Sequence, residues 1–155
     1  VLHEIVTFDM GLDRFVNLLK SEMAIRFPKN EFMVWGDPAG ASREGIYEQT
    51  SFEFLKTNGI LARPTATNDF KVRREAVAMP MNRLIQGKPG FLVNRKCLRL
   101  RKSLFRDKPN KNEHSHVGDS VGYCLLGGGE MRRMTRGNKS YSQPFVAKTD
   151  FNVFA

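Results

Sequence analysis

Short apolar runs that stop at turn residues alternate along this chain with longer segments in which apolar residues recur at helical spacing. The apolar runs lie at 1–8, 32–35, 59–64 and 90–94, and the first three are expected to form strands. Helices are expected over 12–25, 50–58, 70–85, 95–105 and from 112 or 115 to 126, with Pro80 kinking or splitting the third. Strands that alternate with helices are typical of an α/β fold, in which helices cover a sheet.

The composition fits one folded domain with a basic surface. The 155 residues are 41% hydrophobic, which is enough for a single core, and no apolar run approaches the length that spans a bilayer. The formal net charge of +9 favours a polyanionic partner, nucleic acid before membrane, although a basic surface can also serve solubility alone. Cys97 and Cys124 lie far apart without a Cys-x-x-Cys spacing, which argues against a zinc site or disulfide framework and favours a reducing compartment.

The domain is expected to cover residues 1–126. Three consecutive glycines, 127–129, end the last helix, and the polar and basic residues that follow have no sustained period. We therefore expect 127–155 to be a glycine-led, basic and flexible C-terminal tail. Because 1–8 is already typical of a strand and no signal pattern precedes it, we also expect the chain to be a fragment whose upstream part is missing.

Asp37 stands where the apolar run "FMVW" breaks into "GDPAG". A carboxylate at the C-terminal end of a strand is well placed for function, because ligands and catalytic groups collect at that edge of open α/β sheets. The alternative is a turn residue whose side chain bonds its own backbone. The sequence leaves both interpretations open.

A second acid, Asp119, lies in the expected last helix, "NEHSHVGDSVGYCLL". At 100° per residue it shares a polar face with Asn112, His116 and Tyr123, nearly opposite the apolar face that includes Val121. Asn112 and His116 could orient a carboxylate or contact a phosphate there. The alternative is a solvated polar face with an acid near the helix start.

Two acids from different elements can converge on a divalent metal. Mg²⁺ prefers carboxylate oxygens together with water and substrate phosphates. Two such ions roughly 3.5 to 4 Å apart stabilise the attacking and leaving oxygens of an in-line phosphoryl displacement. The chain supplies Asp37 and Asp119 for this chemistry and no obvious third acid. Glu4 is expected to be a surface acid.

The segments around these acids occur in a specific order. "GDPAG" is followed by "TSFEFLKTNGI", "ARPTATND", "VRREAVAMPMNRLIQGKPGFLVN" and "KNEHSHVGDSVGY". Over residues 1–130 this order and spacing resemble the C-terminal nuclease domain of the large terminase subunit of tailed bacteriophages. Asp37 matches the middle acid of that family, and Asp119 matches the acid of its "SH-x-x-DA-x-x-Y" helix, with Ser120 in place of alanine.

The resemblance implies a fold and an activity. The fold is an α/β, RNase H-like mixed sheet flanked by helices, here truncated at its N-terminal end. The activity is a DNA endonuclease that cuts concatemeric viral DNA during genome packaging, in the cytoplasm of the host cell. Asp37 and Asp119 are the expected catalytic residues and ligands of a two-metal Mg²⁺ or Mn²⁺ site. The implied partners are double-stranded DNA, the portal, the small terminase subunit and an upstream ATPase domain, with no membrane.

One acid of the family pattern has no match in this chain. The family's first acid lies in the first strand, and "FDMG" stands too close to Asp37 to leave room for the elements between. Asp9 is therefore expected to be the N-cap of the first helix or a loop acid, and the first acid is expected upstream of Val1. No Gly-x-x-x-x-Gly-Lys-Ser/Thr motif occurs either. On this basis the chain alone is expected to be inactive as a nuclease.

Basic residues cluster between 71 and 111, where only two acids occur. Such clustering is typical of a surface that contacts phosphates without reading sequence, although it is also compatible with a solvated face. The expected DNA contacts are Arg73, Arg74, Arg95, Lys96, Arg99, Arg101 and Lys102. Two other functions stay open: a resolvase-like or transposase-like nuclease of the RNase H superfamily, and a catalytically silent DNA-binding module.

Overall fold

The structure is a computed structural model that describes residues 1–42, 49–104 and 115–130. It is a mixed α/β fold, which confirms the predicted class. The helices of this part of the chain are α1 (Leu12–Arg26), α2 (Ser51–Thr57), α3 (Phe70–Met81), α4 (Leu98–Leu104) and α5 (Ser115–Gly127), with a 3-10 turn, η1 (Pro38–Ala41). The strands are β1 (Val34–Gly36), β2 (Ala62–Pro64), β3 (Leu84–Ile85) and β4 (Lys88–Pro89).

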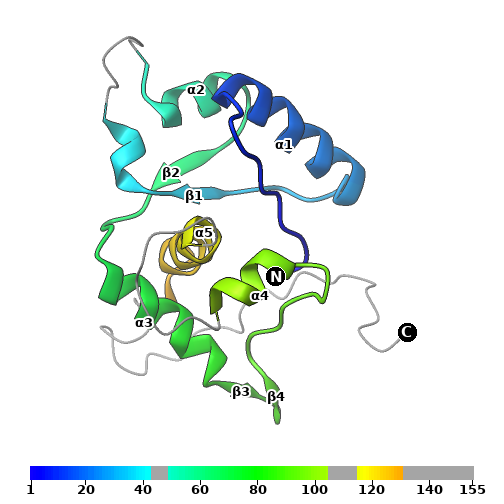
Figure 1. Cartoon of the computed structure of the whole chain (residues 1–155), viewed down its shortest axis with the longest axis vertical. Helices are drawn as coiled ribbons and strands as arrows, with labels where there is room; N and C mark the ends of the chain where they lie inside the picture. Colours follow the sequence, from blue (N-terminus) through cyan, green and yellow to red (C-terminus); the bar gives the residue numbers. More distant parts are fainter. Residues whose placement is uncertain (43–48, 105–114, 131–155) are drawn as a thin grey trace.

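Helix α5 lies at the centre of the molecule (Figure 1). On one side of it are β1 and β2 with α1 and α2 beyond them, and on the other side are α3 and α4. The strands form two separate pairs in the described residues. β1 and β2 are parallel, with Val34 opposite Ala62 and Gly36 opposite Pro64, whereas β3 and β4 form an antiparallel hairpin. The α/β class is thus present, with two small sheets.

Glycines on α5 allow three elements to approach it closely. A Cβ atom on Gly118 would overlap Ser103 of α4, and one on Gly127 would overlap the indole of Trp35 in β1. A Cβ on Gly122 would lie 3.2 Å from that of Arg73 in α3. Neighbouring residues therefore pack closely against α5 on several sides, because the glycines leave room where a side chain would otherwise stand.

The predicted strand at 1–8 is wrong. This segment runs between α1 and α4 without joining a sheet (Figure 1). The Val1 amino group donates to the Leu92 carbonyl, and the Asn94 amide donates to the Val1 carbonyl at 2.9 Å. Val1, Ile5 and Val6 line a cavity beside α5 and do not pair in a ladder, so the strand-like composition did not lead to a strand. The 90–94 run also has no strand assignment.

The predicted helix at 70–85 ends at Met81, one residue after Pro80, so Pro80 does not divide it into two helices. Proline has no amide hydrogen to donate to the preceding turn, which disfavours continuation of the helix and fits its end at the next residue. Leu84 and Ile85 form β3, and the turn to β4 uses positive φ angles of 52° at Gln86 and 77° at Gly87. That conformation suits a two-residue hairpin.

Other helix boundaries agree with the sequence pattern. Asp69 caps α3 by accepting from the Val72 amide at 3.0 Å, as predicted. The N-cap of α1 is Gly11, so Asp9 is a loop acid, with a positive φ of 50°. None of the described helices combines the length and the apolar character needed to cross a membrane. The fully buried side chains include Val16 of α1 and Leu100 of α4.

Candidate functional site

Asp37 follows β1 directly and uses its two carboxylate oxygens differently. Oδ1 accepts a hydrogen bond from the Ala39 amide at 2.9 Å, which makes Asp37 the N-cap of η1. Oδ2 accepts from the Tyr123 hydroxyl of α5 at 2.6 Å. The turn interpretation of Asp37 is therefore right for one oxygen, while the other connects the end of β1 to the central helix.

Asp119 and Tyr123 lie one turn apart on α5, and both contact Arg73 of α3. The Arg73 Nη2 lies 3.1 Å from Asp119 Oδ1, and its Nη1 donates to the Tyr123 hydroxyl. The guanidinium carbon also lies 4.6 Å from the centroid of the Tyr123 ring, within the range of a cation–π contact. The four side chains form a continuous series, Asp37 to Tyr123 to Arg73 to Asp119, which we call the Asp37–Asp119 network.

Burial within the network is graded. Tyr123 is 6% exposed and the Arg73 side chain 12%, whereas the Asp119 side chain is 34% exposed. Gly122 favours this arrangement, because a Cβ atom there would lie tightly against the stem of Arg73, 3.2 Å from its Cβ. The network is therefore buried at the phenol and open to solvent at Asp119.

The surroundings of Tyr123 and Asp37 determine the protonation state of each side chain. Burial, reinforced by the hydrogen bond to Asp37, raises the pKa of Tyr123 to about 12. For Asp37, burial acts to raise the pKa, but the hydrogen bonds from Tyr123 and the Ala39 amide, with the charge of Arg73, outweigh it and hold the pKa below its usual value. At neutral pH the phenol is a neutral donor and Asp37 an ionised acceptor.

The two acids of the network are carboxylates, which are suitable ligands for a divalent metal ion. No cluster of three or more His, Cys, Asp or Glu residues that could hold a metal occurs among the described residues. Two carboxylates are nevertheless sufficient, because Mg²⁺ is commonly bound through one or two carboxylates with water and substrate phosphates. Asp37 and Asp119 suit a hard cation by their chemistry, but an oxygen of Asp119 already pairs with Arg73.

Sequence reasoning placed Tyr123 on the same face as Asp119 but gave it no role. It also assigned Arg73 to DNA, whereas the structure engages this side chain with Asp119 and Tyr123. A signal was present in the sequence: an acid and a tyrosine four residues apart share a helix face and offer two acceptors to one guanidinium. Which of the many basic residues would fill that position could not be read from spacing.

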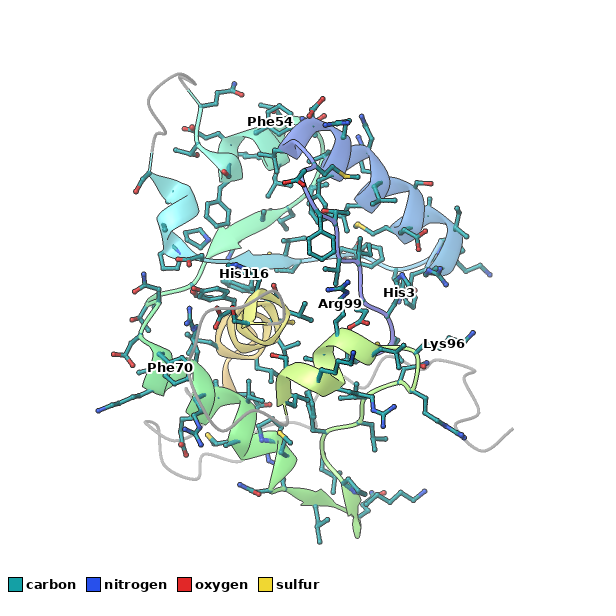
Figure 2. All side chains as sticks on the ribbon, viewed as in Figure 1. His3, Phe54, Phe70, Lys96, Arg99 and His116 are labelled. Atoms are coloured by element: carbon teal, nitrogen blue, oxygen red, sulfur yellow. The ribbon has the colours of Figure 1, made fainter. Side chains whose placement is uncertain are left out.

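The two neighbours predicted for Asp119 are not part of the Asp37–Asp119 network. His116 is exposed at the start of α5 and lines a cavity described below (Figure 2). Asn112 lies outside the described residues.

The other predicted DNA contacts fall into two groups. Arg99 is half-buried, and its guanidinium carbon lies 4.7 Å from the centroid of the Phe8 ring. Figure 2 shows this side chain near the middle of the molecule and Lys96 extending from its edge. The exposed side chains are those of Arg74, Arg95, Lys96, Arg101 and Lys102. Only this second group presents its charge to solvent as the prediction required.

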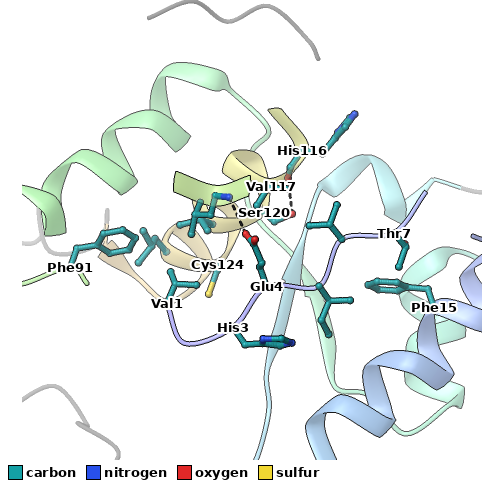
Figure 3. A pocket seen from close by; sticks show the side chains of 15 residues that line it. Val1, His3, Glu4, Thr7, Phe15, Phe91, His116, Val117, Ser120 and Cys124 are labelled. Atoms are coloured by element: carbon teal, nitrogen blue, oxygen red, sulfur yellow. Dashed lines mark hydrogen bonds between the residues drawn. The ribbon is translucent and has the colours of Figure 1, made fainter. Parts of the chain in front are cut away.

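A cavity of about 490 Å³ lies on the apolar side of α5, between that helix and the N-terminal segment (Figure 3). Val117, Cys124 and Phe15 are among its lining residues. Glu4 also lines it, with its carboxylate accepting from the amides of Arg99 at 3.0 Å and Leu100 at 2.9 Å. The expectation that Glu4 is a surface acid is wrong, because it caps the first turn of α4.

The chain was compared with known proteins by sequence and by structure. No family model, curated protein or solved structure matches it.

Proposed function

We propose that this chain is the nuclease part of a metal-dependent DNA endonuclease of the terminase large-subunit type. The observation that carries the proposal is the Asp37–Asp119 network, in which a carboxylate from the end of a strand and one from a helix are joined through two shared side chains. Such a pair of carboxylates can hold a divalent cation, and bound divalent cations stabilise the attacking and leaving oxygens in the hydrolysis of a phosphodiester.

Each member of the network has a distinct task in this proposal. A bound Mg²⁺ or Mn²⁺ would supply charge stabilisation and an activated water. Asp37 is held ionised and oriented by the Ala39 amide and Tyr123, so it is ready to act as a ligand. The Asp119 side chain is 34% exposed, so a DNA backbone could approach the network there. Tyr123 is a positioning residue, because it would act through its hydrogen bond to Asp37.

The exposed basic side chains support a nucleic acid as the substrate. Arg95 and Lys96 precede α4, and Arg101 and Lys102 lie on it, so four charges gather around one short element. Basic side chains that contact DNA neutralise phosphates and give affinity without sequence preference. By the resemblance, the substrate is concatemeric viral DNA at the stage of genome packaging, in contact with a portal, a small terminase subunit and an ATPase domain.

The test is cleavage of a supercoiled plasmid with Mg²⁺ or Mn²⁺. We expect Asp37→Asn and Asp119→Asn each to abolish cleavage, while Asp13→Asn, at an exposed acid in the first turn of α1, leaves it unchanged. Because the resemblance implies a further acid upstream, the assay compares this chain with a chain extended at its N-terminal side. Full activity of the Asp37→Asn protein in the active chain would reject the proposal.

A second function is favoured by a specific observation. Asp37 caps η1 and Asp119 pairs with Arg73, so both acids already have structural partners and could serve a DNA-binding module without catalysis. The two functions differ in their response to metal. A silent module binds DNA equally with and without Mn²⁺, and Asp37→Asn leaves that binding unchanged. A resolvase-like nuclease instead retains metal-dependent cleavage but prefers branched DNA over linear duplex.

A further inference from the structure

We propose that Arg73 and a divalent cation compete for the Asp37–Asp119 network, so that cation binding releases the Arg73 guanidinium toward a DNA phosphate. The inference rests on the proposed function and deepens it, by making one side chain the link between metal binding and DNA binding. It is carried by the contacts of Arg73, by its incomplete hydrogen bonding and by the position of α3.

Arg73 occupies acceptors that a cation would need. Its Nη2 is 3.1 Å from Asp119 Oδ1, and its Nη1 contacts the Tyr123 hydroxyl, which in turn donates to Asp37. An oxygen that pairs with a guanidinium at this distance has fewer lone pairs for a metal ion. The positive charge of the guanidinium, which is itself only 12% exposed, also opposes a second cation beside it. The ion pair between Arg73 and Asp119 and the coordination of a metal ion by Asp119 therefore weaken each other.

The Arg73 guanidinium is incompletely satisfied where it lies. Its Nε is buried and has no hydrogen-bond partner in the structure. A buried donor without a partner carries a desolvation cost that is recovered when the group reaches water or an acceptor. Asp37, by contrast, accepts from the Ala39 amide through a contact that does not involve Arg73. Arg73 is therefore the member of the network that can leave, while the carboxylate at the end of β1 stays oriented.

A DNA phosphate is the acceptor that suits a released Arg73. The guanidinium offers paired N–H groups that match a phosphate in two-point geometry. The next residue of α3, Arg74, is exposed, so the helix already presents basic charge to solvent beside the network. If DNA draws Arg73 away from Asp119, it also removes the competitor of the metal. By thermodynamic linkage, DNA and the cation then favour each other's binding.

The test measures Mn²⁺ affinity by titration calorimetry on the full chain. We expect Arg73→Gln to bind Mn²⁺ about 5- to 150-fold more tightly than the unchanged protein, the range typical of coupled sites. Lys71→Gln is the matched control, because it removes one exposed positive charge from the same helix without touching the network. We expect its Mn²⁺ affinity to stay close to that of the unchanged protein, since exposed charges are screened by salt.

Folding is checked by the thermal midpoint, and Arg73→Lys serves as a second variant. Lysine keeps the charge as a single point, so it cannot contact Asp119 and Tyr123 together as the guanidinium does. We expect a gain in Mn²⁺ affinity that is smaller than for Arg73→Gln. Should Arg73→Gln fail to fold, an Arg73→Lys protein with unchanged or weaker Mn²⁺ affinity overturns the competition.

The coupling between DNA binding and Mn²⁺ binding is measured by repeating the Mn²⁺ titrations with a short DNA duplex present. We expect the duplex to increase the Mn²⁺ affinity of the unchanged and Lys71→Gln proteins and to have a much smaller effect on Arg73→Gln. Equal enhancement in all three proteins would overturn the inference, because DNA would then act without Arg73.

The outcomes separate this inference from the proposed function. Mn²⁺ binding that is lost in Asp37→Asn but unchanged in Arg73→Gln overturns the competition alone and leaves the metal site standing. A tighter Arg73→Gln site in a protein that does not cleave DNA even when extended at its N-terminal side supports the competition and rejects the nuclease. Absence of Mn²⁺ binding in every variant, Arg73→Gln included, overturns both.

Discussion

The Tyr123 hydroxyl donates to Asp37 Oδ2 across 2.6 Å and so joins the middle of α5 to the end of β1. The same hydroxyl accepts from Arg73, so a single oxygen connects a strand end, the central helix and α3. Because Tyr123 is almost fully buried, the contact is made with little competition from water. Asp37 and Asp119 are therefore held in one framework by a residue that is itself not acidic.

We expect Tyr123→Phe to reduce the free energy of unfolding by about 2 kcal/mol, the scale of a hydrogen bond to a charged group. The ring and its packing stay, so the loss reports the hydroxyl. Urea unfolding followed by fluorescence measures it, because Trp35 is the one tryptophan and packs on α5.

A double-mutant cycle with Asp37→Asn provides the control for this assignment. Residues in direct contact show interaction energies of about 0.5 to 3 kcal/mol. If the effects of Tyr123→Phe and Asp37→Asn simply add, the two side chains do not interact in the folded protein.

Stability is expected to fall in alkali through the same residue. The pKa of Tyr123 is about 12 in the folded chain, above the value of 10.0 for an unperturbed tyrosine. Between these values the folded protein holds a proton that the unfolded chain has lost, so the free energy of unfolding decreases as pH rises. The stabilisation is fully present below pH 10 and is lost by about pH 12.

Comparison with Tyr123→Phe isolates this effect. The unchanged protein should show a steeper loss of urea stability above pH 10 than the variant, and one phenol should titrate late by ultraviolet absorbance. Parallel stability curves for the two proteins would show that Tyr123 ionises normally.

Close packing of α5 leads to a prediction at Gly127. A methyl group there would overlap the indole of Trp35, so we expect Gly127→Ala to destabilise the protein by about 1 to 3 kcal/mol, the usual cost of overpacking. Unfolding in urea provides the measurement. Ser120→Ala, at an exposed position of the same helix, is the control, with an expected change within about 0.5 kcal/mol.

A smaller partner should relieve the clash. Combined with Trp35→Leu, the Gly127→Ala substitution should cost measurably less than it does alone, and circular dichroism then replaces fluorescence as the probe. An equal cost in both backgrounds would place the strain elsewhere, for example in the geometry of the helix end.

Local patterns predicted the elements that depend on local interactions. The cap of α3 by Asp69 and the end of α2 near Asn58 follow from side chains and backbone within a few residues. The strand predicted for 1–8 is absent because the conformation of this segment depends on partners far along the chain. Glu4 caps α4 at Arg99 and Leu100, and nothing near Glu4 in the sequence indicates that.

In the candidate site, too, the features that depend on one element could be predicted and those that depend on distant contacts could not. Asp37 at a strand end and Asp119 on a polar helix face could be predicted, since each depends on one element. Their connection could not, because it requires α3 to pack on α5 at Gly122 and bring Arg73 onto Tyr123. The cluster of basic residues led to a wrong prediction for Arg73, which is largely buried and pairs with Asp119 instead of facing solvent.

Exposure separates the basic residues that could contact DNA directly in the proposed function from those that already pack inside the protein. Lys96, Arg101 and Lys102 are exposed in and next to α4, whereas Arg99 is half-buried against Phe8. We expect replacement of these three exposed residues by glutamine to weaken binding of any duplex to a similar degree. The slope of log affinity against log salt should flatten by up to about 0.9 for each phosphate that the variant no longer neutralises.

A charge-matched triple variant on α1 and the loop that follows it makes this test specific. Replacing the exposed Arg14, Lys20 and Lys29 by glutamine removes the same charge from a different surface. We expect that variant to keep the salt slope, because direct neutralisation of phosphates and not net charge determines how many counterions are released. Equal flattening in both variants would mean that DNA responds to overall charge, and the surface around α4 would lose its assignment as the DNA-binding face.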